Sequence, residues 1–299
     1  MLTLHKTFLA KRVGAALLAL CCGFGASNAL AQNLNGLSNA PVIGPVDNGG
    51  GIINSEIALV VGLNDNQVLY SKNADVIRPI ASISKLLTAL VITRSGLPLD
   101  EKITITADDI DRVKKSSSRL SVGTTLSRRE MLLLSLMSSE NRAAHALGRT
   151  YPGGMTAFVN EMNSVARQLG MTRSRFVEPT GLSPMNVSTP NDLVRLLRAV
   201  GKDSLIKRFS TSDDYSVITS NGRTEKYRNT NRLVRNNDWS IHISKTGYIR
   251  ESGQSLVMIT EFEKRPVAVV LLNAEGTLTR FADAVRVRHV VQNDYPSLF

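Results

Sequence analysis

The sequence predicts an α+β fold of three layers, α/β/α, in which the two ends of the chain supply one antiparallel sheet and the middle supplies an inserted helical region. Apolar runs typical of strands occur near both ends of the globular part, at residues 56–63, 67–71, 241–245, 255–263 and 267–273. Between these groups the apolar residues recur at helical spacing. Of the 299 residues, 42% are hydrophobic, which is enough to bury a sizeable core.

The strands and helices follow from local start and stop signals. The first two strands are joined by a turn at residues 64–66, and the last two by Lys264-Arg265 before Pro266. The first predicted helix, 82–93, ends before Gly96. A capping box, Ser127 with Glu130, opens a helix that runs through Leu136. Further helices are expected at 140–149, at 155–169 before Gly170, after Pro190 and at 280–291.

The N-terminal residues precede this fold and have the pattern of a secretory signal peptide, residues 1–31. Lys6, Lys11 and Arg12 make a positive start, an apolar run follows at 13–24, and small residues precede a cleavage site after Ala31. The apolar run is short for a membrane span, so we expect a cleaved signal and at most a loose association with the membrane. An uncleaved anchor is the alternative. Residues 32–52, rich in Asn, Gly and Pro, are expected to form a flexible lead-in.

Cysteine content and charge restrict the chemistry of the exported chain. Both cysteines, Cys21 and Cys22, lie inside the signal, and Leu20 before them does not fit a lipoprotein signal. The mature chain then contains no cysteine, which excludes disulfides and thiol catalysis. The net charge is 36 − 25 = +11, and loss of the three basic signal residues leaves +8. Export and a single tryptophan disfavour nucleic acid as the partner, whereas an anionic wall polymer remains compatible.

Three short motifs occur in a fixed order: Ser82-Ile-Ser-Lys85, Ser139-Glu-Asn141 and Lys245-Thr246-Gly247. Each motif by itself is common. Together and in this order they predict an acyltransferase with an active-site serine that uses lysine in place of histidine.

Ser82 and Lys85 are predicted to act as nucleophile and general base. The serine begins a helix, where free N–H groups favour an anionic intermediate, and the lysine lies one turn further on the same face. A lysine can accept the serine proton only if its pKa falls far below about 10.4. Burial and a second cation, for which Lys245 is the candidate, would lower it.

The other two motifs supply supporting groups. The Ser139 hydroxyl is expected to relay a proton to the leaving amine, and the Asn141 amide to hold Lys85 or a substrate carbonyl. Thr246 is expected to bind a substrate carboxylate, while Gly247 lets a substrate strand approach closely. The backbone N–H groups of Ser82 and Tyr248 are the predicted oxyanion donors.

Other residues imitate these motifs. Ser204 and Lys207 also have the S-x-x-K spacing, and Ser71 with Asn73 has the S-x-N spacing, but neither pair has the required order along the chain. His145 and His242 are interpreted as structural, because no G-x-S-x-G elbow and no metal-binding spacing accompany them.

Longer stretches resemble one family, the low-molecular-mass penicillin-binding proteins, which are serine D-Ala-D-Ala peptidases. Within it the chain is similar to the penicillin-binding protein 7 type, the D-alanyl-D-alanine endopeptidases of Gram-negative bacteria. The resemblance covers about residues 53 to 292. It is carried by the stretches Arg78-Pro-Ile-Ala-Ser-Ile-Ser-Lys85, Leu136-Met-Ser-Ser-Glu-Asn-Arg-Ala144, Tyr151-Pro-Gly-Gly154, Arg175-Phe-Val-Glu-Pro-Thr-Gly-Leu182 and Lys245-Thr-Gly247.

The resemblance implies a β-lactamase/transpeptidase-like catalytic domain at 53–299, located in the periplasm and needing no cofactor. It implies cleavage of the D-alanyl cross-links of peptidoglycan through an acyl-enzyme at Ser82, and acylation of the same serine by β-lactam antibiotics. Lys85, Ser139, Asn141 and Lys245 would form the supporting shell. Other cell-wall enzymes are conceivable partners.

Three alternatives stay open at the level of sequence. Class A β-lactamases share all three motifs, and Glu178-Pro179 superficially matches their deacylating glutamate, but Leu182 stands where that family has asparagine. A non-catalytic wall-binding module could retain the same fold. Within the family, the sequence does not separate endopeptidase from carboxypeptidase activity.

Overall fold

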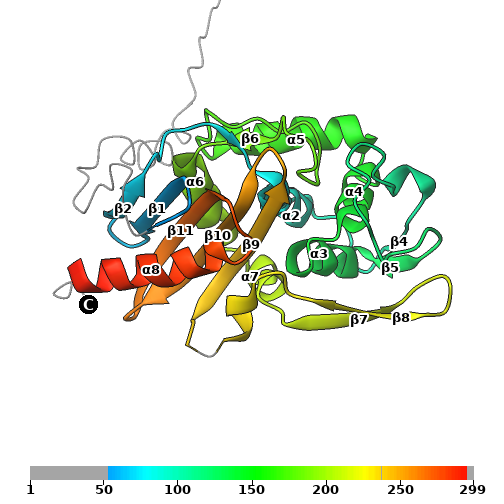
Figure 1. Cartoon of the computed structure of the whole chain (residues 1–299). Helices are drawn as coiled ribbons and strands as arrows, with labels where there is room; N and C mark the ends of the chain where they lie inside the picture. The colour runs from blue at the N-terminus through cyan, green and yellow to red at the C-terminus, as the bar shows by residue number, and fades with distance from the viewer. Residues whose placement is uncertain (1–52, 237, 295–299) are drawn as a thin grey trace, which may run out of the picture.

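The computed structural model describes residues 53–236 and 238–294 (Figure 1). The predicted signal peptide and the whole predicted lead-in, residues 32–52, therefore lie outside the described residues. The described chain contains one five-stranded sheet with the order β2-β1-β11-β10-β9, in which every neighbouring pair is antiparallel. Its strands are β1 (Ile57–Gly62), β2 (Val68–Lys72), β9 (Ile241–Ile249), β10 (Gly253–Phe262) and β11 (Arg265–Ala274). The prediction that both ends of the chain build one sheet is confirmed.

Alternate side chains of the central strands enter two different cores. In β1, Leu59 and Val61 belong to the larger core between the sheet and the helical region, whereas Ala58 and Val60 belong to a smaller core on the opposite face. β11 shows the same alternation along residues 267–272. Both faces of the sheet are therefore covered, which explains why these strands are apolar at nearly every position.

The helices form the two outer layers, as predicted. α8 (Thr279–Asp294) crosses one face of the sheet, and the helical region lies on the other side (Figure 1). That region contains α2 (Ser84–Arg94), α3 (Arg128–Met137), α4 (Asn141–Arg149), α5 (Gly154–Gln168), α6 (Pro190–Val200) and α7 (Ser204–Ser210). The three-layer α/β/α prediction is therefore correct.

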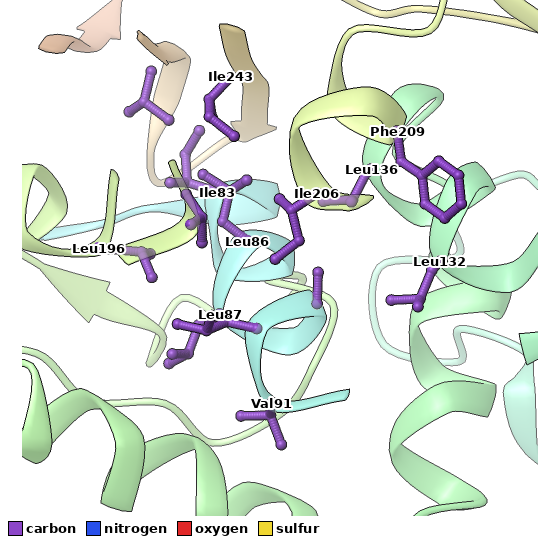
Figure 2. Packing of buried hydrophobic residues seen from close by; sticks show 14 of the residues in the cluster. Ile83, Leu86, Leu87, Val91, Leu132, Leu136, Leu196, Ile206, Phe209 and Ile243 are labelled. Carbon is purple, nitrogen blue, oxygen red and sulfur yellow. The ribbon is translucent and has the colours of Figure 1, made fainter. Parts of the chain in front are cut away.

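Helix α2 forms the centre of the larger core. Figure 2 shows side chains of α2 among residues from α3, α6, α7 and β9. Every residue of α2 from Ser84 to Ile92 is buried, so neighbours fix this helix on all sides. The predicted helix 82–93 begins in the structure with a 3₁₀ turn, η2 (Ala81–Ile83), which leads directly into α2. The turn that carries Ser82 is thus attached to a helix that is buried along nearly its whole length.

The structure also contains elements that the sequence pattern did not indicate. The most prominent is a two-stranded hairpin, β7 (Asp214–Ile218) and β8 (Thr224–Arg228), which lies beside the helical region (Figure 1). Two shorter pairs join β3 (Arg78–Pro79) to β6 (Val187–Ser188) and β4 (Lys102–Thr104) to β5 (Thr125–Ser127). Two 3₁₀ turns, η3 (Ala107–Asp109) and η4 (Arg232–Arg235), complete the element order. Within the described residues, no helix has the length and apolar character needed to cross a membrane.

Candidate active site

The turn that presents Ser82 has an unusual backbone. Ala81 has a φ of 48°, in the left-handed region that residues with a Cβ atom seldom adopt. Hydrogen bonds on both sides hold this conformation: the Ile80 N–H donates to the Asn186 carbonyl at 3.0 Å, and the Ser84 hydroxyl donates to the Ala81 carbonyl at 2.9 Å. Ser82 follows Ala81 in this turn and is only partly buried, so its hydroxyl is accessible from solvent.

Lys85 lies one helical turn after Ser82, and its amine contacts three groups: the Ser82 hydroxyl, the Asn141 side chain and the backbone carbonyl of Thr180. Its Nζ atom is 2.9 Å from Ser82 Oγ, 2.8 Å from Asn141 Oδ1 and 2.6 Å from the Thr180 carbonyl oxygen. The neutral amine has two N–H groups and one lone pair. If the two N–H groups bind Asn141 and Thr180, the lone pair faces the Ser82 hydroxyl. This arrangement suits a base that removes the serine proton.

Burial makes Lys85 an easier base to generate. Its side chain is completely buried, and this burial lowers the pKa of Lys85 from 10.5 to about 8. The negative charges of Glu178 and Glu140 act in the opposite direction and raise it. The predicted effect of Lys245 is not seen in this balance. The repulsion between the two amines acts instead on Lys245, because the charge of Lys85 is one of the causes that lower the pKa of Lys245.

The S-x-N motif lies between two helices, as expected. Ser139 occupies the connection from α3 to α4 with a left-handed φ of 61°, and Asn141 is the first residue of α4. The Asn141 side chain joins two partners, because its Oδ1 atom accepts from Lys85 and its Nδ2 atom donates to Ser116 Oγ at 3.0 Å. The helix cap is Glu140, whose side chain accepts the Arg142 N–H at 3.2 Å. Ser139 is therefore free of the capping role.

The third motif lies on β9, at the edge of the central sheet. Lys245 is 1% exposed, and its Nζ atom donates to the Thr246 carbonyl at 3.1 Å. Burial, followed by the charges of Lys85 and Arg280, holds the pKa of Lys245 well below its usual value. Thr246 Oγ1 donates to Thr230 Oγ1 at 2.7 Å.

Gly247 brings β9 against the nucleophile turn. A Cβ atom at this position would lie 2.9 Å from the Ile80 carbonyl oxygen and 3.3 Å from Ala81 Cβ, so only glycine allows the approach without displacement. The next residue, Tyr248, has a side chain that is 59% exposed at the rim. The first and third motifs therefore meet at this point, as the sequence prediction requires.

Two residues near β9 were missed by the sequence analysis. Arg280, at the start of α8, donates through Nη1 to the carbonyl oxygens of Gly247 at 2.9 Å and Ser255 at 3.1 Å. Thr230 donates its N–H to the Met137 carbonyl at 3.0 Å and pairs with the Thr246 hydroxyl. Neither residue has a local sequence signal, because each reaches the site through tertiary contacts.

A third missed feature is the loop of residues 178–183. Its Thr180 carbonyl contacts Lys85, and a Cβ atom on Gly181 would lie 1.8 Å from the Ala81 carbonyl oxygen. The Glu178 carboxylate accepts hydrogen bonds from the loop itself, including the N–H groups of Thr180 at 2.6 Å and Gly181 at 2.7 Å. The glutamate that suggested a β-lactamase base is thus turned toward its own backbone.

The residues interpreted as imitations have other partners. His145 Nδ1 lies 2.8 Å from Asp109 Oδ1, and His242 Nε2 lies 2.8 Å from Glu261 Oε1. Ser204 begins α7 behind its cap residue, Asp203. These contacts account for each residue without a catalytic role.

Comparisons with known proteins agree with this geometry. A family model described as D-alanyl-D-alanine carboxypeptidase matches residues 47–276. The D-alanyl-D-alanine endopeptidase of Escherichia coli is 48% identical over 237 residues, which cover 79% of this chain and 76% of the relative.

Solved structures show the same architecture. The crystal structure of a Streptomyces DD-transpeptidase matches with a TM-score of 0.75 and 26% identity, over 82% of this chain and 99% of that one. A penicillin-binding protein of Listeria monocytogenes in its ampicillin-bound form matches with a TM-score of 0.68 and 28% identity, over 81% and 99% of the two chains.

Proposed function

The chain belongs to the D-alanyl-D-alanine carboxypeptidase family of serine peptidases, and from that membership and the geometry of the site we propose the reaction and the role of each residue. The enzyme is a serine DD-peptidase of the D-alanyl-D-alanine endopeptidase type that acts on peptidoglycan. Its substrate in this proposal is the D-alanyl cross-link between two wall peptides. Hydrolysis of that link separates the peptides, whereas a carboxypeptidase would release a terminal alanine.

One observation carries the assignment of the catalytic pair. Lys85 Nζ lies 2.9 Å from Ser82 Oγ in a buried site that lowers the pKa of the lysine to about 8. A base with this pKa is partly neutral near neutral pH, and it is positioned within hydrogen-bond distance of the proton it must accept. Both conditions for activating a serine are met by the same side chain.

Acylation then follows from the positions of the other groups. Ser82 Oγ attacks the carbonyl carbon of the D-alanyl bond while its proton passes to Lys85 Nζ. The negative charge on the former carbonyl oxygen faces the N–H groups of Ser82 and Tyr248, which we assign as the oxyanion donors. Thr246, supported by Thr230, binds a carboxylate of the substrate peptide.

Release of the first product needs a proton on the leaving nitrogen. We assign the relay to the Ser139 hydroxyl, which receives the proton held by Lys85 and passes it to the amine as the C–N bond breaks. Water then attacks the acyl carbon and gives a proton to Lys85. Lys85 passes this proton to Ser82 Oγ as the ester C–O bond breaks, which regenerates the serine hydroxyl. Asn141 keeps Lys85 in place throughout, and Lys245 supplies polarity beside Thr246.

β-Lactams enter the same scheme as pseudo-substrates. Ser82 would open the strained amide ring and form a covalent ester. The Glu178 carboxylate already accepts hydrogen bonds from the backbone of its own loop, so it is not free to activate a water molecule for rapid hydrolysis of that ester. This argues against the β-lactamase alternative. A slow loss of the adduct is therefore expected.

The N-terminal signal pattern indicates where the enzyme acts. The signal pattern in residues 1–31 supports a mature periplasmic chain that begins at Gln32 and carries a net charge of +8. N-terminal sequencing of the exported protein tests the cleavage site. Binding of the mature chain to isolated sacculi should weaken with added salt if the charge contributes to attachment.

The activity is tested with purified wall fragments analysed by mass spectrometry. Loss of cross-linked dimers, together with appearance of monomers, supports the endopeptidase assignment. Loss of a single terminal alanine from monomers would instead assign carboxypeptidase activity. The Ser82→Ala variant is the control and should leave both the cross-linked dimers and the monomers unchanged.

A further inference from the structure

We propose that Glu178 is a positioning residue for catalysis, because its carboxylate folds the loop of residues 178–183 into the support that orients Lys85 toward Ser82. This inference deepens the proposed function and rests on it. The Glu178 carboxylate binds its own loop and acts on Lys85 through the carbonyl group of Thr180.

The Glu178 carboxylate is fully engaged with its own loop. One oxygen, Oε2, accepts from the N–H of Thr180 at 2.6 Å and from its hydroxyl at 2.5 Å. The other, Oε1, accepts from the N–H groups of Gly181 at 2.7 Å and Ser183 at 3.3 Å. A single side chain therefore accepts four hydrogen bonds from residues 180–183, three from backbone N–H groups and one from the Thr180 hydroxyl, which makes it the organising group of the loop.

The loop organised in this way holds helix α2 at two points. The Thr180 carbonyl accepts Lys85 Nζ at 2.6 Å, and the Pro179 carbonyl accepts the Thr88 hydroxyl at 2.7 Å. Both acceptors are backbone atoms, so their directions depend on the fold of the loop. Asn186 fixes the other side, because its Nδ2 atom donates to the Glu178 carbonyl at 2.8 Å and to Ser84 Oγ at 3.0 Å.

The direction of the Thr180 carbonyl decides where the lone pair of Lys85 points. A neutral amine has two N–H groups to place, and Asn141 Oδ1 accepts one of them. The Thr180 carbonyl accepts the second only while the loop keeps its shape. If that acceptor moves away, an N–H group can turn toward Ser82 Oγ, and the lone pair no longer faces the proton that must be removed.

The charge of Glu178 has a second consequence for the same lysine. Two carboxylates, Glu178 and Glu140, raise the pKa of Lys85 against the stronger effect of burial. Lys245 on β9 is the neighbouring basic group, and its own pKa is lowered by burial and then by the charges of Lys85 and Arg280. Loss of the negative charge at Glu178 should therefore lower the pH at which Lys85 becomes neutral. A purely structural residue would change stability without moving this pH.

The experiment compares Glu178→Gln, Glu178→Asp and the control Glu275→Gln, which removes one negative charge at an exposed position outside the site. The second-order rate of acylation by a fluorescent penicillin is measured from pH 6 to pH 10. In the wild type the rate should rise with pH around a midpoint near 8. For Glu178→Gln we expect a midpoint lower by about half a unit or more and a plateau reduced at least about tenfold.

Glu178→Asp separates geometry from charge. It keeps the charge and shortens the reach, so the midpoint should stay in place while the plateau falls at least about tenfold. This variant decides the question if Glu178→Gln does not fold. Glu275→Gln should match the wild type in both quantities.

Two results would overturn the proposal. One is a wild-type midpoint and plateau in both Glu178 variants. The other is normal acylation with a selective loss of adduct hydrolysis in Glu178→Gln, which would make the carboxylate a base for water. A wild-type protein that is not acylated at all would contradict the proposed function itself, so the two failures are distinguishable.

Discussion

A Cβ atom placed on Gly181 would lie 1.8 Å from the carbonyl oxygen of Ala81. The loop after Glu178 and the turn that presents Ser82 are therefore in direct backbone contact. Both contact residues have left-handed φ angles, 81° at Gly181 and 48° at Ala81. The conformation of the nucleophile turn thus depends on a glycine far away in the sequence.

Gly181→Ala should therefore destabilise the protein and slow acylation of Ser82 together. The added methyl group meets the Ala81 carbonyl, and alanine also disfavours the left-handed φ, so we expect a loss of about 2–4 kcal/mol in the free energy of unfolding. Gly222→Ala is the matched control, because Gly222 has a φ of 75° but no atom within 4 Å of an added Cβ. Chemical denaturation measures the free energy of unfolding of both variants, and we expect the larger loss for Gly181→Ala. Equal losses for the two variants would contradict the contact between residue 181 and the Ala81 carbonyl.

The pH dependence of stability reports the burial of Lys85. Its pKa is lowered from 10.5 to about 8, so below pH 8 the folded state bears the full cost of a buried ammonium, about 3 kcal/mol. Between pH 8 and 10.5 the unfolded state binds more protons, and stability rises with pH. Across this window the unfolding free energy of the wild type should gain about 3 kcal/mol relative to Lys85→Met. A constant difference between the two proteins would contradict the lowered pKa.

Thr230 is expected to support substrate binding through Thr246. The two hydroxyls are 2.7 Å apart, and Thr230 is also tied to the end of α3 through the Met137 carbonyl. Thr230→Val removes the hydroxyl at nearly constant volume, and the loss of one hydrogen bond should lower kcat/KM for wall peptide about fivefold, mainly through KM. Thr230→Ser keeps the hydroxyl and should be close to wild type. Equal kinetics for the two variants would rule out this role.

Asp283 is expected to fix the beginning of the described chain. Its fully buried carboxylate accepts from the Asn54 N–H at 3.1 Å, the Ser55 N–H at 2.6 Å and the Arg286 guanidinium at 2.7 Å. Asp283→Ala leaves these donors without an acceptor and should cost about 2–4 kcal/mol of stability. Asp213→Ala, at an exposed position, should cost much less. Thermal unfolding measures both, and similar midpoints would contradict the anchoring role.

The fold was predictable wherever burial produces a sequence period. The strands near both ends alternate between two apolar cores, and α2 repeats apolar residues at helical spacing. The β7–β8 hairpin was missed because its strands bury only Val217 and Tyr227, while the apolar Ile218 is exposed to solvent, so no clear strand period results. The predicted strand 241–245 was too short, since glycine usually weakens a strand and Gly247 follows directly. In the structure β9 continues through Gly247 to Ile249, because the glycine allows close contact with η2.

The site was predictable only as far as its side chains form ordered motifs. Ser82, Lys85, Asn141 and Gly247 are brought together as the motif order requires. The contribution of Thr180 could not be predicted, because its contact with Lys85 uses a backbone carbonyl that any residue possesses. The contacts of Arg280 and Thr230 with β9 could not be predicted either, because they arise from tertiary packing and leave no periodic or local signal in the sequence.

The most direct test of the catalytic assignment is peptide mapping by mass spectrometry after incubation with a labelled penicillin. We expect one adduct, on the peptide that contains Ser82, which disappears in Ser82→Ala and persists in Ser204→Ala, the variant of the other S-x-x-K serine. Lys85→Met should reduce the rate of labelling by about a thousandfold or more. An adduct on a different residue, or undiminished labelling of Ser82→Ala, would contradict the assignment of Ser82 as the nucleophile activated by Lys85.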